Sequence, residues 1–190
     1  ENSTYGRVAD AYYLLPNSDL FIIKEHFLRV HINLLALPGV SLSEIKIAMS
    51  HTVLLGQCRK FLSKNNIKPL SGIDTAGSAK IVSESSDRSQ SALASPLAGK
   101  IYGLDALGVE IEDMKNNTTR FLIMANKKQD LDLSKNAKFM TTIVFQVRNI
   151  PAALYKAMGG FATNNVNMVK LESYMVSGSF TSTQFYADIE

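Results

Sequence analysis

The chain has 190 residues, of which 46% are apolar and 19% charged, and this balance is typical of a globular protein and excludes general disorder. The formal charge of +3 is small and the basic residues are scattered, so no nucleic-acid partner is expected. The single cysteine, Cys58, excludes an internal disulfide and a cysteine-based zinc or redox centre. The longest apolar runs are far shorter than the roughly 20 residues of a membrane span, so we expect a cytoplasmic protein without membrane partners.

Short helices alternate with extended segments through the first 125 residues. Leu54, Leu55 and Cys58 begin a helical apolar repeat, and Ser41 with Glu44 has the spacing of a capping box. The predicted elements, in chain order, are a helix at Val8–Leu15, one half-buried strand at Phe27–Leu37, a short helix after Ser41, an amphipathic helix at Thr52–Lys64, a helix after Asp74, a strand at Ser91–Ala94, a helix at Pro96–Tyr102 and a buried strand at Thr119–Ala125. This alternation predicts an α/β sheet domain.

The helix after Asp74 begins at a segment that could bind an anion. Ala76, Ala79 and Val82 recur at helical spacing after Asp74 and Thr75. The first amides of a helix have no partner within it and can bind a negatively charged group. The start of this helix is therefore a candidate site for an anion, with helix capping as the alternative role of its polar residues.

A polar, charged stretch separates this region from a second one. Residues 127–138 contain no aromatic side chain and are typical of a linker. The predicted elements after it are a strand at Phe139–Val147, a helix at Pro151–Thr163, a strand at Val166–Met175 and a strand at Ser179–Ile189. This βαββ order is part of a split βαβ module of βαββαβ order, so we expect a further helix and strand to follow beyond the last residue.

The residues alone identify no cofactor chemistry. The three histidines, His26, His31 and His51, are dispersed, and no metal-ligand cluster, phosphate-binding glycine loop or serine nucleophile elbow is apparent in the sequence. Neither a metal nor an organic cofactor is predicted. The polar residues from Asn117 to Arg120 crowd the start of the predicted strand, where side chains are well placed to face a cleft.

Thr119-Arg120-Phe121, which follows an asparagine and opens an apolar strand, resembles the hallmark triplet of the prephenate dehydratase family. Further segments occur in the family's order, and they are Glu1-Asn2-Ser3 with Gly6, Ser50-His51 with Gln57-Cys58, Asp74–Ala79 and Tyr102-Gly103-Leu104. Segments nearer the end resemble the family's ACT module, and they are Leu154–Ala157, Phe161-Ala162, Val166-Asn167 and Lys170–Ser173. The resemblance covers the whole chain.

The resemblance implies an α/β fold with two domains. Residues 1–126 would form a two-lobed catalytic domain similar to a small periplasmic binding protein, incomplete at its N-terminus. Residues 139–190 would form a ferredoxin-like α+β ACT domain, incomplete at its C-terminus. The implied activity is that of a hydro-lyase that converts prephenate to phenylpyruvate in phenylalanine biosynthesis, and it requires no cofactor.

The resemblance also implies roles for individual residues, each with a structural alternative. Thr119 would contact the departing hydroxyl, or it is an ordinary strand residue. Arg120 would bind a substrate carboxylate through its planar fork, or it forms an internal ion pair. The candidate substrate-binding residues, whose alternatives are capping, turn or core positions, are Asn2, Ser3, His51, Gln57, Thr75, Asn117 and Phe121.

In the second module, the resembled family binds phenylalanine between two ACT units, which implies L-phenylalanine as an allosteric ligand and a homodimer or homotetramer. The candidate ligand-binding residues are Ala152, Ala153, Leu154, Asn167, Glu172 and Ser173. This chain departs from the family at two places. Ala152 stands where the family has glycine, and Tyr174-Met175 stands where it has arginine and proline.

Other readings remain open at the level of sequence. Arogenate dehydratase would perform the same elimination on the aminated analogue of prephenate. A noncatalytic amino-acid sensor would keep both modules, although it has no need of Thr119 and Arg120. A periplasmic solute-binding protein would share the two-lobed shape but not the ACT-like region.

Overall fold

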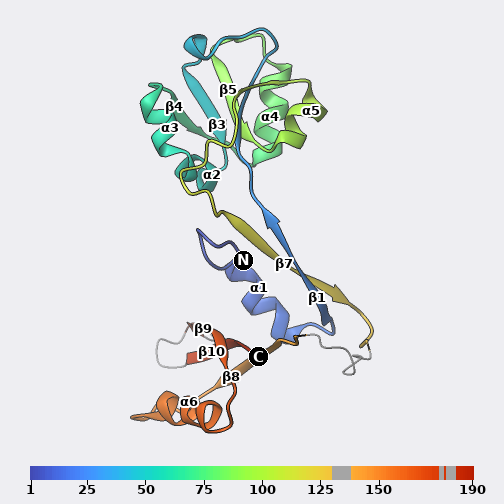
Figure 1. Cartoon of the computed structure of the whole chain (residues 1–190), viewed down its shortest axis with the longest axis vertical. Coiled ribbons are helices and arrows are strands. Elements are labelled where there is room, and N and C mark those ends of the chain that lie inside the picture. Colours follow the sequence, from blue (N-terminus) through green and yellow to red (C-terminus); the bar gives the residue numbers. More distant parts are fainter. Residues whose placement is uncertain (130–137, 176–177, 179–182) are drawn as a thin grey trace. The chain divides into compact units, whose positions relative to one another are not determined.

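The computed structural model describes residues 1–129, 138–175, 178 and 183–190. The chain divides into two compact units (Figure 1). The first contains Glu1–Val8 and Ile22–Met124, and the second contains Ala9–Phe21 and Ala125–Glu190. The predicted linker lies mostly outside the described residues, and the predicted domain limits stay a prediction. Within the described part of the chain, no helix is both long and apolar enough to cross a membrane.

A five-stranded mixed sheet forms the centre of the first unit. Its strands lie in the order β4-β3-β5-β2-β6, with bounds β2 (Asn33–Ala36), β3 (Ile47–Ser50), β4 (Lys68–Ser71), β5 (Gln90–Ala94) and β6 (Asp105–Gly108). β3 runs parallel to β4 and β5, while β2 runs antiparallel to β5 and β6. The predicted mixed α/β class is confirmed.

Helices cover both faces of this sheet. Helices α2 (Thr52–Gln57) and α3 (Arg59–Lys64) pack on one face, and α4 (Thr75–Glu84) and α5 (Pro96–Tyr102) pack on the other. Leu34 of β2 belongs to the core cluster of the first pair, whereas its neighbour Leu35 belongs to that of the second pair. Because successive residues of a strand face opposite sides, β2 is buried along its whole length.

The prediction of one half-buried strand at Phe27–Leu37 is wrong. The segment contains the end of β1 (Phe21–Arg29) and, after a gap, the fully buried β2. β1 pairs with β7 (Thr118–Ala125) in a separate two-stranded sheet, in which the strands run in opposite directions (Figure 1). β7 is not the buried strand that its apolar sequence predicts, because Phe121 and Ile123 are exposed and its other residues are only half-buried.

The predicted helix at Thr52–Lys64 is interrupted at Cys58, and two short helices take its place. Asp113 stabilises the break from outside the helix. Its backbone N–H donates to the Gln57 carbonyl at 2.6 Å, and its carboxylate accepts from the Lys60 amide at 3.2 Å. One residue therefore caps the end of α2 and the start of α3.

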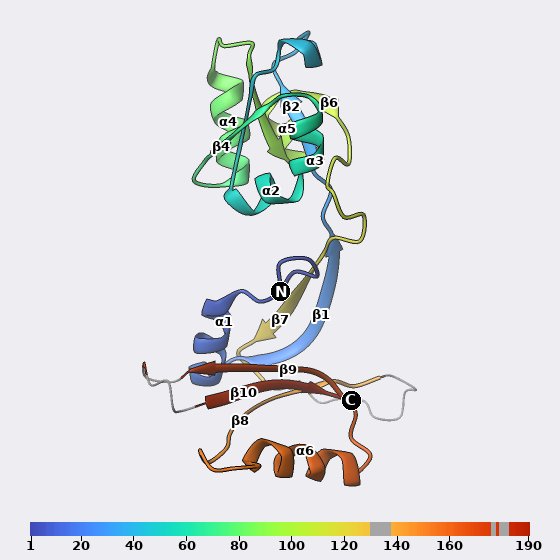
Figure 2. The same cartoon turned by 90° about the vertical axis from the view of Figure 1, so that its left-hand side faces the viewer.

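The second unit contains a three-stranded antiparallel sheet in the order β8-β10-β9, formed by β8 (Thr141–Gln146), β9 (Met168–Met175) and β10 (Thr183–Ile189). On one face, Phe145 and Phe185 stack at 5.3 Å between ring centres, and Phe161 of α6 (Ala153–Thr163) lies 6.2 Å from Phe145. Tyr174 on β9 packs edge-on against Tyr13 of α1 (Ala9–Leu14) at 5.6 Å. Figure 2 shows α6 and α1 on opposite faces of this sheet. The βαββ order is as predicted for the described residues.

Candidate active site

The first residues of the chain lie along the start of β7. Asn2 forms β-bridges with Gly6 and with Thr119. Gly6 has φ +79°, a left-handed conformation that costs glycine little and allows the segment to turn back on itself. The Asn2 side-chain oxygen accepts from the amides of Thr4 and Tyr5 at 2.9 and 3.0 Å, which fixes the orientation of its amide group. The Asn2 side-chain nitrogen therefore points at β7.

A chain of side-chain amides connects this segment to Thr119. Asn2 Nδ2 donates to Asn117 Oδ1 at 2.7 Å and to Thr119 Oγ1 at 3.1 Å. Asn117 Nδ2 in turn donates to Gln57 Oε1 at 3.0 Å. Asn117 and Gln57 are 1% and 7% exposed, so water hardly competes for these bonds. We call these four residues, Asn2, Gln57, Asn117 and Thr119, the amide network.

Thr119 is the member of the network that can do chemistry on a ligand. Its oxygen accepts a hydrogen bond from Asn2, while the hydroxyl proton stays available to an acceptor. The side chain is half-buried, so one side of it can be reached. A hydroxyl held in this way can donate a hydrogen bond in a fixed direction.

A pocket of about 390 Å³ adjoins the network. It is lined by Thr4, Tyr5, Gly56, Gln57, Glu112, Asp113, Met114 and Asn117. A methyl group at Gly56 would collide with the Tyr5 hydroxyl, so a glycine allows the tyrosine to lie against α2. Since two carboxylate side chains line the pocket, an anionic group is not favoured in it.

Arg120 lies between two carboxylates. Its Nε donates to Glu25 Oε2 at 2.6 Å, and its Nη1 lies 3.4 Å from Glu1 Oε2. The guanidinium side chain is 15% exposed. This is the internal ion pair that the sequence left open as an alternative, and binding of a substrate carboxylate by Arg120 stays a prediction.

The other predicted residues of the first unit occupy structural positions. Ser3 Oγ accepts from the Thr118 amide at 2.9 Å and donates to the Asn116 carbonyl at 3.0 Å, so it anchors the first segment. His51 Nδ1 accepts from the Val53 amide at 3.3 Å as the N-cap of α2. Phe121 is 49% exposed, so the interpretation of this residue as core is wrong.

Thr75 is the first residue of α4, but its neighbour Asp74 is the cap. The Asp74 carboxylate accepts from the Gly77 amide at 2.5 Å. A protein carboxylate therefore already interacts with the helix terminus at which we predicted an external anion. In the described part of the chain, no hydrogen bond connects His51 or Thr75 to the amide network. Their role in substrate binding stays a prediction.

The candidate ligand residues of the second unit fall into two groups. Ala152, Ala153 and Leu154 line a pocket of about 240 Å³ at the start of α6. Ala152 has φ +62°, the conformation suited to the glycine that the resemblance implies there. Asn167 donates to Glu190 Oε1 at 2.8 Å, and Glu172 on β9 lies 3.3 Å from Lys170 Nζ. Ser173 is exposed on β9.

Several residues of the site were not predicted from the sequence, among them Glu25, Tyr5 and Asp113. Glu25 pairs with Arg120, while Tyr5 and Asp113 line the pocket. The alternation along β1 could have indicated that Glu25 shares a face with Ile23, but not that it faces Arg120. The contacts of Tyr5 and Asp113 depend on chain segments that are distant in sequence and carry no local signal.

Comparison with known proteins places this site in a family. A family model described as prephenate dehydratase matches residues 1–129. The bifunctional N-acyl-homoserine lactone acylase/prephenate dehydratase of Komagataeibacter europaeus is 45% identical over 190 residues, which are 100% of this chain and 67% of that protein. The chloroplastic arogenate dehydratase/prephenate dehydratase 1 of Arabidopsis thaliana is 39% identical over 173 residues, 91% of this chain and 44% of that protein.

A solved structure of a prephenate dehydratase is also similar to this chain. The prephenate dehydratase of Arthrobacter aurescens in complex with L-Phe has a TM-score of 0.84 and 27% identity, covering 97% of this chain and 61% of that chain. The chain thus spans only part of each of these proteins. Because the family model matches more than half of the chain and includes the amide network, this chain belongs to the prephenate dehydratase family.

Proposed function

We propose that the protein containing this chain converts prephenate to phenylpyruvate. In this reaction the bond from the ring to its carboxylate breaks and releases carbon dioxide. The freed electron pair enters the ring, and the 4-hydroxyl group takes up a proton and leaves as water. Aromatisation drives both losses, so the protein has to orient the substrate and assist the departing hydroxyl.

The observation that carries the proposal is the bond from Asn2 to Thr119 Oγ1. With its oxygen held as an acceptor, Thr119 donates its proton toward the departing hydroxyl of the substrate. A threonine hydroxyl is too weak an acid to remain ionised, so it acts as a hydrogen-bond donor or relays a proton. The polar groups beside Thr119 belong to amides and are already oriented, so little reorganisation accompanies the reaction.

Arg120 contributes to the same site by fixing the first residues of the chain against β7. The ion pairs to Glu1 and Glu25 connect β7 to the chain start and to β1. If Arg120 also binds a substrate carboxylate, the ligand must bind beside these partners or replace one of them. The carboxylates of Glu112 and Asp113 line the pocket beside the network and would repel the substrate's own carboxylates. They favour binding with the ring and hydroxyl toward Thr119.

The test is a pair of substitutions in the full-length protein. Thr119→Ala should lower kcat by about a hundredfold or more, the scale of a positioned donor at the reacting group, with little change in melting temperature. Thr119→Ser keeps the hydroxyl and should retain most of the activity. Thr118→Ala removes the neighbouring threonine, whose side-chain hydroxyl makes no hydrogen bond among the described residues, and serves as the control. Near-normal turnover in a folded Thr119→Ala variant would contradict the proposal.

Arogenate is the alternative substrate. The Arabidopsis relative is named for both arogenate and prephenate. Arogenate carries an ammonium group where prephenate has a carbonyl, and it yields phenylalanine instead of phenylpyruvate. Incubation of the full-length protein with each substrate, with both products measured, decides between them.

A second candidate function is deacylation of N-acyl-homoserine lactones. The Komagataeibacter relative carries that activity in its name, and its 45% identity extends over all 190 residues. The assay measures release of homoserine lactone by the parent and by Thr119→Ala. Loss of both activities in this variant would assign them to one site, whereas loss of dehydration alone would separate them. Absence of both from the parent would favour the noncatalytic sensor.

For the regions that the comparisons leave open, we propose the arrangement that the resemblance implies. Residues 1–126 contribute to a two-lobed catalytic domain, and residues 139–190 to an ACT domain that binds L-phenylalanine and pairs with a second copy in a dimer or tetramer. Support comes from the βαββ order, from the pocket at Ala152–Leu154 and from the L-Phe in the Arthrobacter structure. Measurement of phenylalanine binding and of the molecular mass of the full-length protein tests both parts.

A further inference from the structure

A histidine and two glutamates that are distant in sequence come together where the chain enters and leaves the five-stranded sheet. His31 lies between β1 and β2, and Glu110 and Glu112 lie between β6 and β7. The backbones are held together by two hydrogen bonds. Ile111 N donates to Ile32 O at 2.9 Å, and Glu110 N donates to the side-chain oxygen of the buried Asn33 at 3.1 Å.

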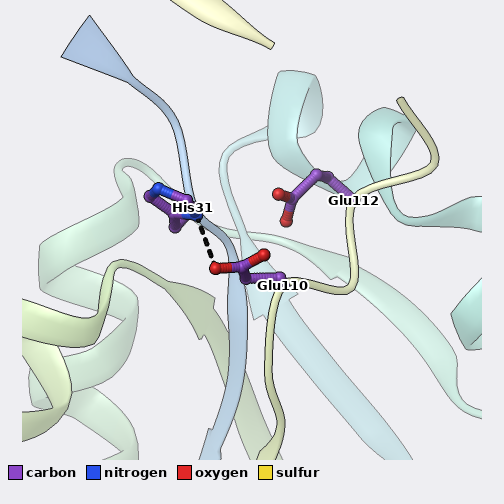
Figure 3. Close-up of side chains that lie close together, drawn as sticks. All are labelled: His31, Glu110 and Glu112. Atoms are coloured by element: carbon purple, nitrogen blue, oxygen red, sulfur yellow. Dashed lines mark ion pairs between the residues drawn. The ribbon is translucent and has the colours of Figure 1, made fainter. Parts of the chain in front are cut away.

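The three side chains converge. Figure 3 shows the Glu110 carboxylate beside the His31 ring and the Glu112 carboxylate turned toward both. One donor atom from each of these residues lies within 4.8 Å of the other two. Glu110 reaches this position with φ +49°, a strained conformation for a residue other than glycine. Glu112 is 8% exposed, and its Oε2 accepts from the Ile32 amide at 3.1 Å, so its direction is fixed.

His31 Nδ1 is the group that points to a ligand. The atom is buried and has no hydrogen-bond partner among the described residues. Glu110 Oε1 lies 3.1 Å from it, close enough for an ionic contact but without hydrogen-bond alignment. A cation placed between this nitrogen and the carboxylate oxygen would accept an electron pair from each of them.

The donor set suits a particular class of cation. One imidazole nitrogen with two carboxylate oxygens favours borderline divalent ions such as Zn²⁺ over Mg²⁺ and Ca²⁺, which prefer oxygen alone. Bonds of about 2.0 to 2.2 Å place the donors of one tetrahedral ion roughly 3.5 Å apart. The His31–Glu110 pair is near this spacing, and the Glu110 side chain, 52% exposed, has room to rotate.

We propose that His31, Glu110 and Glu112 bind one Zn²⁺-class ion. With three protein ligands, a fourth position would be left for water or an external group. The ion would connect the segment that enters the sheet to the segment that leaves it. Binding would therefore stabilise the folded protein in proportion to the metal concentration.

The test measures binding to the metal-stripped full-length protein by equilibrium dialysis with Zn²⁺ and by the visible absorption of added Co²⁺. We expect one ion per chain at this site, a higher melting temperature with Zn²⁺ and no comparable shift with Mg²⁺. His31→Gln, Glu110→Gln and Glu112→Gln should each weaken binding by about tenfold or more, the scale on which changes around a metal act. His26→Gln and Glu84→Gln, an exposed histidine and an exposed glutamate outside the cluster, are the matched controls.

The variants also show what would overturn the proposal. Glu112→Gln keeps an oxygen that can accept from Ile32, and Glu110 is exposed, so both variants should fold, which circular dichroism verifies. Zn²⁺ binding of unchanged affinity in all three cluster variants would place the ion elsewhere. Absence of Zn²⁺ and Co²⁺ binding in the parent would overturn the proposal.

Discussion

At the scale of single residues, Arg120 is the candidate whose role the structure changes most. The hallmark triplet makes it a carboxylate binder by resemblance, yet its guanidinium already contacts two protein carboxylates. Both roles depend on a planar fork with several donors. A lysine keeps the charge but presents one point of contact.

We expect Arg120→Lys in the full-length protein to lower kcat/KM by about tenfold or more, because one ammonium cannot hold Glu1 and Glu25 in the same geometry. Arg88→Lys is the matched control, since Arg88 pairs with Glu44 at the exposed surface, where an ion pair contributes little. Steady-state kinetics and thermal melts on both variants provide the measurement. A drop in melting temperature with unchanged kinetics would restrict Arg120 to a structural role.

Cys58 is expected to make stability depend on alkaline pH. Burial raises the pKa of its thiol from 9.0 to about 12, and the charges of Asp113 and Glu112 add to this effect. The folded state therefore keeps its proton at pH values where the unfolded chain loses it. This stabilisation is complete below pH 9 and is lost as the pH rises toward 12.

The measurement is urea unfolding at several pH values from 7 to 11. The free energy of unfolding of the parent should fall relative to Cys58→Ala by about 1.4 kcal/mol per pH unit above the ordinary thiol pKa. Parallel pH curves for the two proteins would mean that Cys58 ionises normally in the fold. The same burial predicts that thiol reagents do not modify Cys58 until the chain is unfolded.

Only part of the site could be predicted from single residues. The spacing of Asn2, Gln57, Asn117 and Thr119 contains no local pattern, and they entered the prediction through their order in a resembled family. Their hydrogen bonds cross as many as 117 residues of sequence. The resemblance identified the members of the network, but the direction of each bond required the structure.

At the scale of elements, the apolar periodicity predicted where helices occur better than it predicted where each helix begins and ends. The apolar repeat at Thr52–Lys64 is present, but Asp113 interrupts it from a distant segment. The strands β3, β4 and β6 were not predicted, and β1 was predicted only at its end. β4 is short and exposed, and it includes Pro69, so it has neither alternation nor apolar character. Such strands are specified by their neighbour in the sheet and not by their own sequence.

The start of α6 offers a test of a local conformation. Ala152 has a positive φ, which costs a residue with a side chain about 1 kcal/mol or more, so Ala152→Gly should stabilise the chain despite the greater freedom of glycine when unfolded. The neighbouring Ala153→Gly lies in the first turn of the helix and should destabilise it by about 0.5 to 1 kcal/mol. Urea midpoints of both variants provide the comparison. Shifts of the same sign would contradict the left-handed conformation at Ala152.

At the scale of the whole molecule, the chain passes between its two compact units more than once. Residues Ala9–Phe21 belong to the second unit, although residues on both sides of them belong to the first. Composition predicts a boundary where a polar stretch occurs, but it cannot show that Tyr13 packs on Tyr174 far along the chain. Long-range packing of this kind leaves no trace in a local sequence window.

The two-stranded sheet presents apolar side chains to solvent. Phe27 and Leu28 on β1 are 57% and 53% exposed, and Phe121 and Ile123 on β7 are also exposed. We expect the 190-residue chain to bind hydrophobic dyes and to self-associate. A Phe27→Ser and Leu28→Ser double variant should reduce dye fluorescence and light scattering, whereas Ile73→Ser, an isolated exposed residue, should not. Equal scattering by all three proteins would exclude these exposed side chains as the cause.

The amide network has a further consequence for how the protein responds to its surroundings. Its members are two asparagines, a glutamine and a threonine, none of which gains or loses a proton in the range where proteins stay folded. Asn2 and Asn117 each donate at one end of the side-chain amide and accept at the other, so rotating either amide by half a turn would break bonds on both sides. The direction of the Thr119 hydroxyl is therefore set by hydrogen-bond geometry alone and does not change with pH. Any pH limit of the reaction should originate in the substrate or in the carboxylates nearby, while the donor itself stays in place until the fold is lost.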